Sequence, residues 1–280
     1  MSETILDHGY VPEEHAPDPV IGHGDPTAPG KVAIWLFLAS EIMFFIAILG
    51  SYIVLRSAAP ALFSKHALAL NKLLAGINTV VLILSSVTMY IAVDAAAKGM
   101  RNRVILALSA TFLCACTFMV IKYFEYTAKF EHYTVVAREG GSQSGPLYVY
   151  DGHLHEHDGQ RTIHGYRAEV WNGFDIHLVA EHDVKQRSGQ SAPQEFHVPP
   201  ANRTPHEVNY GPWKNNFYAS YFTATGVHGV HVVGGMIPIA FLIIFALRGR
   251  LLPHHTEYVG LYWHFVDLVW IFLFPLLYLI

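Results

Sequence analysis

The chain has 280 residues, of which 52% are hydrophobic and 14% charged, whereas about 25% of the residues in a typical soluble protein are charged. This composition, with a mean hydropathy of +0.30, excludes an ordinary soluble globular protein and predicts an integral membrane protein. The net charge of −4 predicts that nucleic acid is not a partner.

The first segment, residues 1–30, is acidic and contains several Pro, Gly and His residues. It lacks the basic start and the apolar core of a signal peptide. We expect it to be a flexible N-terminal tail that stays in the cytoplasm.

Five apolar segments are each long enough to cross about 30 Å of hydrocarbon, which takes about 20 helical residues. Three lie in residues 31–126 and two in residues 215–280. They are Ile34–Leu55, Ala75–Ala97, Val104–Tyr123, Phe217–Leu247 and Gly260–Ile280. The predicted fold is therefore an all-α integral membrane protein, a bundle of five transmembrane helices. Cys114 and Cys116 point about 200° apart on a helix, so they cannot form a disulfide with each other.

Basic residues in the short links predict the orientation. The link after the second span carries Lys98, Arg101 and Arg103, and the link after the fourth carries Arg248 and Arg250. Five spans place both links on one side, which the positive-inside rule makes cytoplasmic. We expect a multi-pass protein of a bacterial inner membrane, with its N-terminus inside and its C-terminus outside.

Residues 127–214 form a polar, His-rich insert that falls outside the cytoplasm in this topology. Asn172–Gly173 stands between two alternating runs, Tyr166–Trp171 and Phe174–Ala180. Asn-Gly between such runs is a strong signal for a β-hairpin. We therefore predict a small β-containing element with a hairpin over residues 166–180.

The insert also contains His153, His155 and His157 in alternation. On a strand these side chains would share one face, which would suit copper or zinc. The pattern is unspecific, and solvated loop histidines are the favoured interpretation, so we expect no metal site in this chain.

Polar residues inside the spans mark function or tight helix pairing, because hydrocarbon penalises isolated charges by several kcal/mol. Glu41 in the first span is a candidate for a proton-exchanging or lipid-facing carboxyl, or for a structural acid bonded to a neighbouring helix. His228 and His231 share a helix face but lack a third ligand for a metal. We expect them to bond to a neighbouring helix or a lipid headgroup.

Two further polar pairs stand three residues apart. His264 and Asp267 lie in the last span, where an imidazole bonded to a carboxyl or a carbonyl would join two helices. Lys122 and Glu125 end the third span, where we expect an interfacial ion pair flanked by belt aromatics. No residue of the chain is assigned a catalytic role.

Taken in order, these segments resemble subunit III of the haem–copper cytochrome c oxidases. YWHFVDLVWIFLFPLLYL at Tyr262–Leu279 resembles the terminal helix of that family, and FTATGVHGVHVVGG at Phe222–Gly235 its penultimate helix. WLFLASEIMFF at Trp35–Phe45 is similar to the helix with the carbodiimide-reactive glutamate, which falls on Glu41. INTVVLILSSVTM and the polar group Lys122, Glu125 and Tyr126 also resemble family helices. The agreement covers roughly residues 31–130 and 211–280.

The resemblance implies a helical subunit without redox cofactors, bound to subunit I, which holds the haems and copper, and close to subunit II. It implies bound phospholipid and support for proton uptake by the complex. Glu41 would lie near proton or lipid traffic, and His228, His231 and Arg248 would make helix or headgroup contacts. A cytochrome c domain near the outer insert is a further possible partner.

The chain departs from the family in two ways. The long form of the family has seven spans, and the two that this chain lacks form one wall of a lipid cleft. The insert has no counterpart in the family core. Alternatives left open are the same subunit in a quinol oxidase, an accessory subunit of a nitric oxide reductase, and a metal transporter or chaperone that uses the outer histidines.

Overall fold

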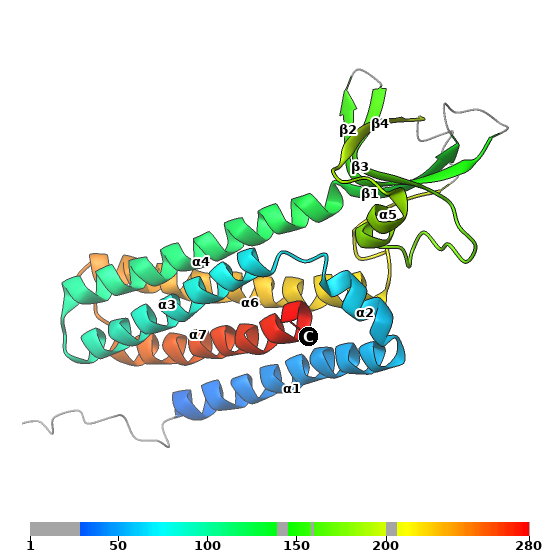
Figure 1. The fold of residues 1–280 in the computed structure, drawn as a ribbon. Coiled ribbons are helices and arrows are strands. Elements are labelled where there is room, and N and C mark those ends of the chain that lie inside the picture. Colours follow the sequence, from blue (N-terminus) through cyan, green and yellow to red (C-terminus); the bar gives the residue numbers. More distant parts are fainter. Residues whose placement is uncertain (1–28, 139–144, 158–159, 200–205, 280) are drawn as a thin grey trace, which may run out of the picture.

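A computed structural model describes residues 29–138, 145–157, 160–199 and 206–279, so the expected tail over residues 1–28 lies outside the described part. Five long helices form a bundle (Figure 1): α1 (Pro29–Ala58), α3 (Lys72–Ala97), α4 (Arg101–Phe130), α6 (Asn216–Leu247) and α7 (Pro253–Phe274). All five are long and apolar enough to span a membrane, α7 together with the π-helical turn Pro275–Leu279. The five predicted spans are confirmed.

The helix ends follow from local sequence. Asn215 precedes α6, and its side-chain oxygen accepts from the backbone N–H groups of Phe217 and Tyr218. α3 and α6 both end at a glycine with positive φ, Gly99 at 68° and Gly249 at 82°. After each glycine, the next backbone N–H donates to the carbonyl five residues earlier: Met100 to Ala95, and Arg250 to Phe245. This bond closes a Schellman motif at both helix ends.

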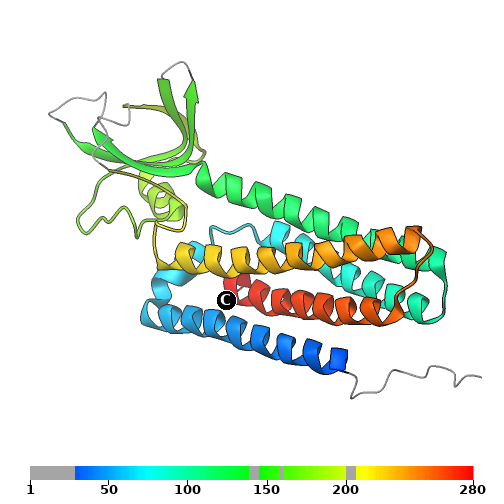
Figure 2. The same cartoon turned by 180° about the vertical axis from the view of Figure 1, so that it is seen from behind.

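Glycines set how closely α7 approaches its neighbours. A Cβ on Gly235 of α6 would lie 2.8 Å from the Trp263 ring of α7. A Cβ on Gly260 of α7 would lie 2.9 Å from Val93 of α3. α7 therefore packs so closely between α3 and α6 that no residue larger than glycine fits at these two positions without movement. α1 packs on α6 and α7 and stays at the edge of the bundle (Figures 1 and 2).

The insert between α4 and α6 is a five-stranded antiparallel sheet with the order β4-β3-β2-β1-β5. Its strands are β1 (His132–Arg138), β2 (Leu147–His157), β3 (Gln160–Glu169), β4 (Gln194–Val198) and β5 (His206–Asn209), with helix α5 (Glu181–Ser188) beside them. The sheet stands at one end of the bundle, where α4 leads into β1 (Figure 1). The links between α3 and α4 and between α6 and α7 lie at the opposite end.

The predicted hairpin over residues 166–180 is wrong. Asn172–Gly173 does form a turn, with Gly173 at φ 78° and the Phe174 N–H donating to the Trp171 carbonyl. β3 already ends at Glu169, however, and the chain after the turn is irregular until α5. Val179 from this stretch packs on the face of the sheet instead of pairing at its edge. The β3 edge is taken by β4, which the local pattern did not reveal.

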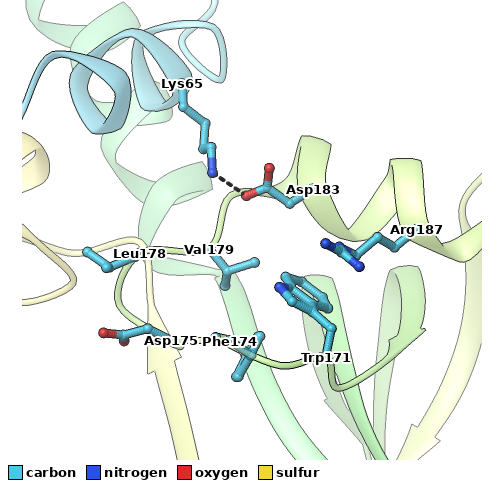
Figure 3. A pocket seen from close by; sticks show the side chains of 9 residues that line it. Lys65, Trp171, Phe174, Asp175, Leu178, Val179, Asp183 and Arg187 are labelled. Carbon is cyan, nitrogen blue, oxygen red and sulfur yellow. Dashed lines mark hydrogen bonds and ion pairs between the residues drawn. The ribbon is translucent and has the colours of Figure 1, made fainter.

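A short helix, α2 (Pro60–Ala67), joins the insert to the bundle. It lies between α1 and α3, and Lys65 on it forms a 2.8 Å ion pair with Asp183 of α5. This pair closes one side of a pocket of about 190 Å³, whose opposite side holds Trp171 with the Arg187 guanidinium over its ring (Figure 3). The Asn215 amide also donates to the His177 carbonyl, which ties the start of α6 to the insert.

Candidate functional site

The first polar site joins α1 to α6. Glu41 Oε2 lies 2.9 Å from His231 Nε2, and the two side chains are only 20% and 15% exposed. The Phe45 ring packs edge-on against the imidazole, with its centroid 4.9 Å away. Glu41 therefore faces a neighbouring helix from a partly exposed position.

The hydrogen bonds of His231 place one proton on its Nδ1 atom and require a second proton between Nε2 and Glu41. His231 Nδ1 lies 2.8 Å from the Val227 carbonyl oxygen, which can only accept, so Nδ1 donates. Nε2 then meets Glu41 either as a neutral acceptor facing a protonated carboxyl or as a charged donor facing a carboxylate. The pair thus holds one proton that can reside on either partner.

His228 does not converge with His231. Its Nε2 atom lies 3.1 Å from the Val266 carbonyl of α7, and the residue is fully buried. The two histidines contact different helices, as the expected helix-bonding interpretation requires. They do not form one metal site.

Lys122 and Glu125 form a second polar site, on the inner face of α4. Their charged groups lie 2.9 Å apart, and the side chains are only 7% and 4% exposed. Tyr221 of α6 and Tyr278 each donate a hydroxyl hydrogen bond of 2.7 Å to Glu125 Oε1. The Trp270 ring lies 5.2 Å from Lys122 Nζ. The expected ion pair is present and is buried in the bundle, because residues from α6 and α7 close around it. Its position at the membrane interface stays a prediction.

A third polar site lies between α3 and α7. His264 Nδ1 is 2.6 Å from the Ser86 hydroxyl, and Asp267 Oδ2 is 3.3 Å from the Ser85 hydroxyl. Trp263 also donates its indole N–H to Ser85. The two residues thus join α7 to α3, through hydroxyls where a carboxyl or a carbonyl was expected. Sequence reasoning missed the serines, although a Ser-Ser pair within an apolar span was the available signal.

Arg248 makes no side-chain bond to any described residue, and its side chain is exposed. The nearby carbonyls are instead capped by Arg101 of α4, which donates to Ala246 and Leu247 at 2.7 and 2.6 Å. The sequence indicated only that Arg101 lies in a basic link. Its bonds to the last carbonyls of α6 are visible only in the tertiary structure.

The three alternating histidines of the insert lie on β2, so His153, His155 and His157 do share a face. The register adds His164 of β3 opposite His153. Within the described ranges, no group of three His, Cys, Asp or Glu side chains is placed to hold a metal ion.

Asp151 lies on the same face of β2, where the strand is buried, and it is the centre of a hydrogen-bond network. Its carboxyl lies 2.6 Å from His132 Nε2 and accepts from Thr134 and Tyr210. Burial would raise the pKa of Asp151, but His132, Lys214 and the Thr134 hydroxyl together hold it below its usual value. Burial lowers the pKa of Lys214 to about 8, although Asp151 opposes this. The network joins β1 and β2 to the segment that leads into α6.

Comparison with known proteins finds similarity in the C-terminal part of the chain. The cytochrome c oxidase subunit III family matches residues 209–280, which include α6 and α7. A cytochrome bo(3) ubiquinol oxidase subunit 3 from Buchnera aphidicola is 33% identical over 75 residues, or 26% of this chain and 39% of that protein. A probable cytochrome c oxidase subunit 3 from Mycobacterium tuberculosis is 43% identical over 63 residues, or 21% and 31%.

A cytochrome c oxidase subunit 3 from Marchantia polymorpha is 47% identical over 66 residues, which cover 21% of this chain and 24% of that protein. The chain thus spans well under half the length of these curated relatives. The matched region carries the side chains that complete all three polar sites: His231, Tyr221 with Tyr278, and His264 with Asp267. Over this region the chain is similar to subunit 3 proteins of cytochrome c and ubiquinol oxidases, and it matches the cytochrome c oxidase subunit III family.

Proposed function

We propose that this chain is subunit III of a respiratory haem–copper terminal oxidase and carries no redox cofactor of its own. In this role it supports oxygen reduction and proton translocation by subunit I, through proton uptake, lipid binding and stability of the complex. The observation that carries the proposal is that the family match falls on the helices whose polar side chains complete the three polar sites described above.

The contribution to proton uptake rests on Glu41 and His231. They share one proton at a partly exposed position between α1 and α6, and the partner that holds the proton can release it. A shared proton at such a place can exchange with a neighbouring subunit or with bound water. The pair is therefore the proposed proton-linked site of this chain.

The proposed partners are subunit I as the main contact, subunit II, and phospholipids. Of the five spans, α1 has the smallest share of residues buried within the bundle. Its Trp35, Leu36 and Met43 side chains are exposed on the surface of the bundle. We assign this face to subunit I, which with subunit II would hold the haems and copper. The exposed Arg248 guanidinium at the end of α6 suits a phospholipid phosphate.

In the proposed orientation the insert and the C-terminus lie outside a bacterial inner membrane, and the two basic links lie inside. This places the sheet on the side where a cytochrome c domain would dock. Matched relatives are named both as ubiquinol and as cytochrome c oxidase subunits, so the proposal applies to either electron donor.

The test is purification of the tagged chain in a mild detergent, followed by mass spectrometry of co-purifying chains and a reduced-minus-oxidised haem spectrum. We expect haem-bearing chains in a fixed ratio to this chain, and none from untagged cells. A chain purified without haem-bearing partners contradicts the proposal. Metal bound to such an isolated chain would instead favour the transporter alternative.

A further inference from the structure

A groove of about 480 Å³ runs between α3 and α7 on the outside of the bundle. Its rim is apolar and exposed, and every residue that lines it comes from one of these two helices. The apolar rim residues include Ile83, Val87, Leu268 and Ile271. The groove lies near the middle of both spans, so its surroundings are hydrocarbon or another helix.

Two polar side chains line this apolar groove without complete hydrogen bonding. Asp267 is 3% exposed, and its Oδ1 atom has no hydrogen-bond partner among the described residues. His264 is bonded through Nδ1 to Ser86, and its Nε2 atom makes no bond to a described residue. The Ser86 hydroxyl can donate or accept in that bond, so Nε2 is an acceptor in one tautomer and an N–H donor in the other, and it is unpaired within the described residues in both.

Hydrocarbon cannot satisfy these atoms. An unpaired polar group within a bilayer costs several kcal/mol, so membrane proteins pair such groups within the protein. An acyl chain would fill the groove but would form no hydrogen bond. A second copy that presented the same groove would have no ridge to place in it. The remaining occupant is a helix of a different chain that brings its own polar group.

We propose that the α3–α7 groove seats a transmembrane helix of another subunit, and that this helix carries a hydroxyl or carboxamide side chain at the level of His264 and Asp267. Such a side chain both donates and accepts, so it can bond to the imidazole Nε2 in either tautomer and donate to the carboxyl. Ser, Thr, Asn and Gln meet this requirement. The apolar rim then packs against the remaining side chains of the same helix. This interface is separate from the α1 face assigned to subunit I.

The test uses the whole complex in native membranes. A photoreactive benzoylphenylalanine is placed at Leu268 on the rim, or at Leu113 on the exposed face of α4 as the matched control position. After illumination, mass spectrometry identifies the adducts. We expect the probe at 268 to label a membrane-spanning peptide of another subunit, with Ser, Thr, Asn or Gln within one turn of the adduct.

Variants at 267 test the polar contact. Asp267→Asn keeps the shape and the hydrogen-bonding capacity and should keep the adduct, whereas Asp267→Leu should lower its yield about fivefold. Because leucine could also disturb the bundle, the mapped polar residue of the partner is changed to Ala with Asp267 intact. The same loss is expected.

Three outcomes overturn the proposal: lipid adducts alone at position 268, adducts to a second copy of this chain, or yields that are equal in all variants. Absence of haem-bearing chains from the complex would overturn the proposed function but not this interface. The two proposals therefore fail separately.

Discussion

At the scale of single residues, the polar side chains of the spans are completed by residues far away in the chain. Glu41 and His231 are 190 positions apart, yet they share a hydrogen bond of 2.9 Å. Lys122 and Glu125 are three apart, but Tyr221 and Tyr278 supply the other bonds. In a low-dielectric interior such networks are favourable only when nearly every polar atom has a partner.

Glu41 should react with a hydrophobic carbodiimide, because its bond to His231 allows the carboxyl to hold the shared proton. Peptide mass spectrometry after labelling should locate the adduct on Glu41. Glu41→Gln should remove it and leave the fold intact, because the amide can donate to His231 Nε2. Glu257, an acid paired with Lys31 at 3.0 Å, is the matched control. Labelling confined to Glu257 and the acids of the insert would contradict this prediction.

Lys122→Met should destabilise the bundle by about 3–5 kcal/mol, because it leaves the buried Glu125 without its cation. Thermal unfolding of the purified complex in detergent measures the loss. The double variant Lys122→Met with Glu125→Gln should be more stable than the sum of the two single changes predicts. Additive effects would mean that the two groups do not act as a pair.

At the scale of helices, small residues and caps decide how the spans meet. Gly235 lets the Trp263 ring of α7 contact the α6 backbone, and Gly260 lets the Val93 side chain of α3 contact the α7 backbone. Arg101 binds the last carbonyls of α6. These contacts set the spacing of α3, α6 and α7, and therefore the distances within the polar site between α3 and α7.

Gly235→Ala should destabilise the α6–α7 contact by about 1–3 kcal/mol, because the added methyl would lie 2.8 Å from Trp263. Gly229→Ala is the matched control on the same helix, since nothing lies within 4 Å of its Cβ position. Thermal unfolding should separate the two variants. Equal stability of both would contradict the close packing.

The junction of α2 with the insert should weaken in acid. Burial lowers the pKa of His66 to about 3, and Lys214 and Lys65 add to the effect. The unfolded ring titrates near 6.5, so between pH 6.5 and 3 the unfolded state binds more protons than the native state. Stability linked to His66 is therefore complete above pH 6.5 and falls as the pH drops towards 3.

Hydrogen exchange at pH 7.5 and 5 tests this, after correction for the intrinsic rate. Protection of α2 and of the segment around His177 should fall at pH 5. His66→Gln should remove the pH dependence and keep a side-chain bond to Asn215, which lies 3.0 Å from His66 Nε2. His182→Gln, on an exposed side chain of α5, is the control. The same pH dependence in His66→Gln and in the native chain would count against His66 as its source.

At the scale of the whole molecule, five spans place the insert and the two basic links at opposite ends of the bundle (Figures 1 and 2). Protease added to intact spheroplasts should cut the insert and spare residues 98–103, because of these two regions only the insert is expected outside. Cleavage at 98–103 alone would reverse the orientation. Deletion of residues 140–205 should leave all five helices inserted, since each has an apolar window of its own. Loss of the other subunits on deletion would make the insert an assembly contact.

The sequence by itself determined the number of spans, their approximate limits and the family resemblance. Each of these depends on local composition: about 20 apolar residues form a helix in a bilayer whatever their neighbours are. The sequence also singled out Glu41, His231, Lys122, Glu125, His264 and Asp267, because a polar residue is conspicuous in an apolar run. It could not tell which of them meet, or which tyrosines and serines complete them, because the pairing of helices depends on residues distant in the chain.

Only the tertiary structure decided where the insert folds back and which polar residues meet. The Asn172–Gly173 turn was correctly predicted from local sequence, but the hairpin was not, because strand pairing depends on which edge is free and β4 takes it. Likewise Lys122 and Glu125 became buried because α6 and the end of the chain close around them. A helix span is settled by its own residues, whereas a strand edge, a buried ion pair and a groove are settled by neighbours distant in the chain.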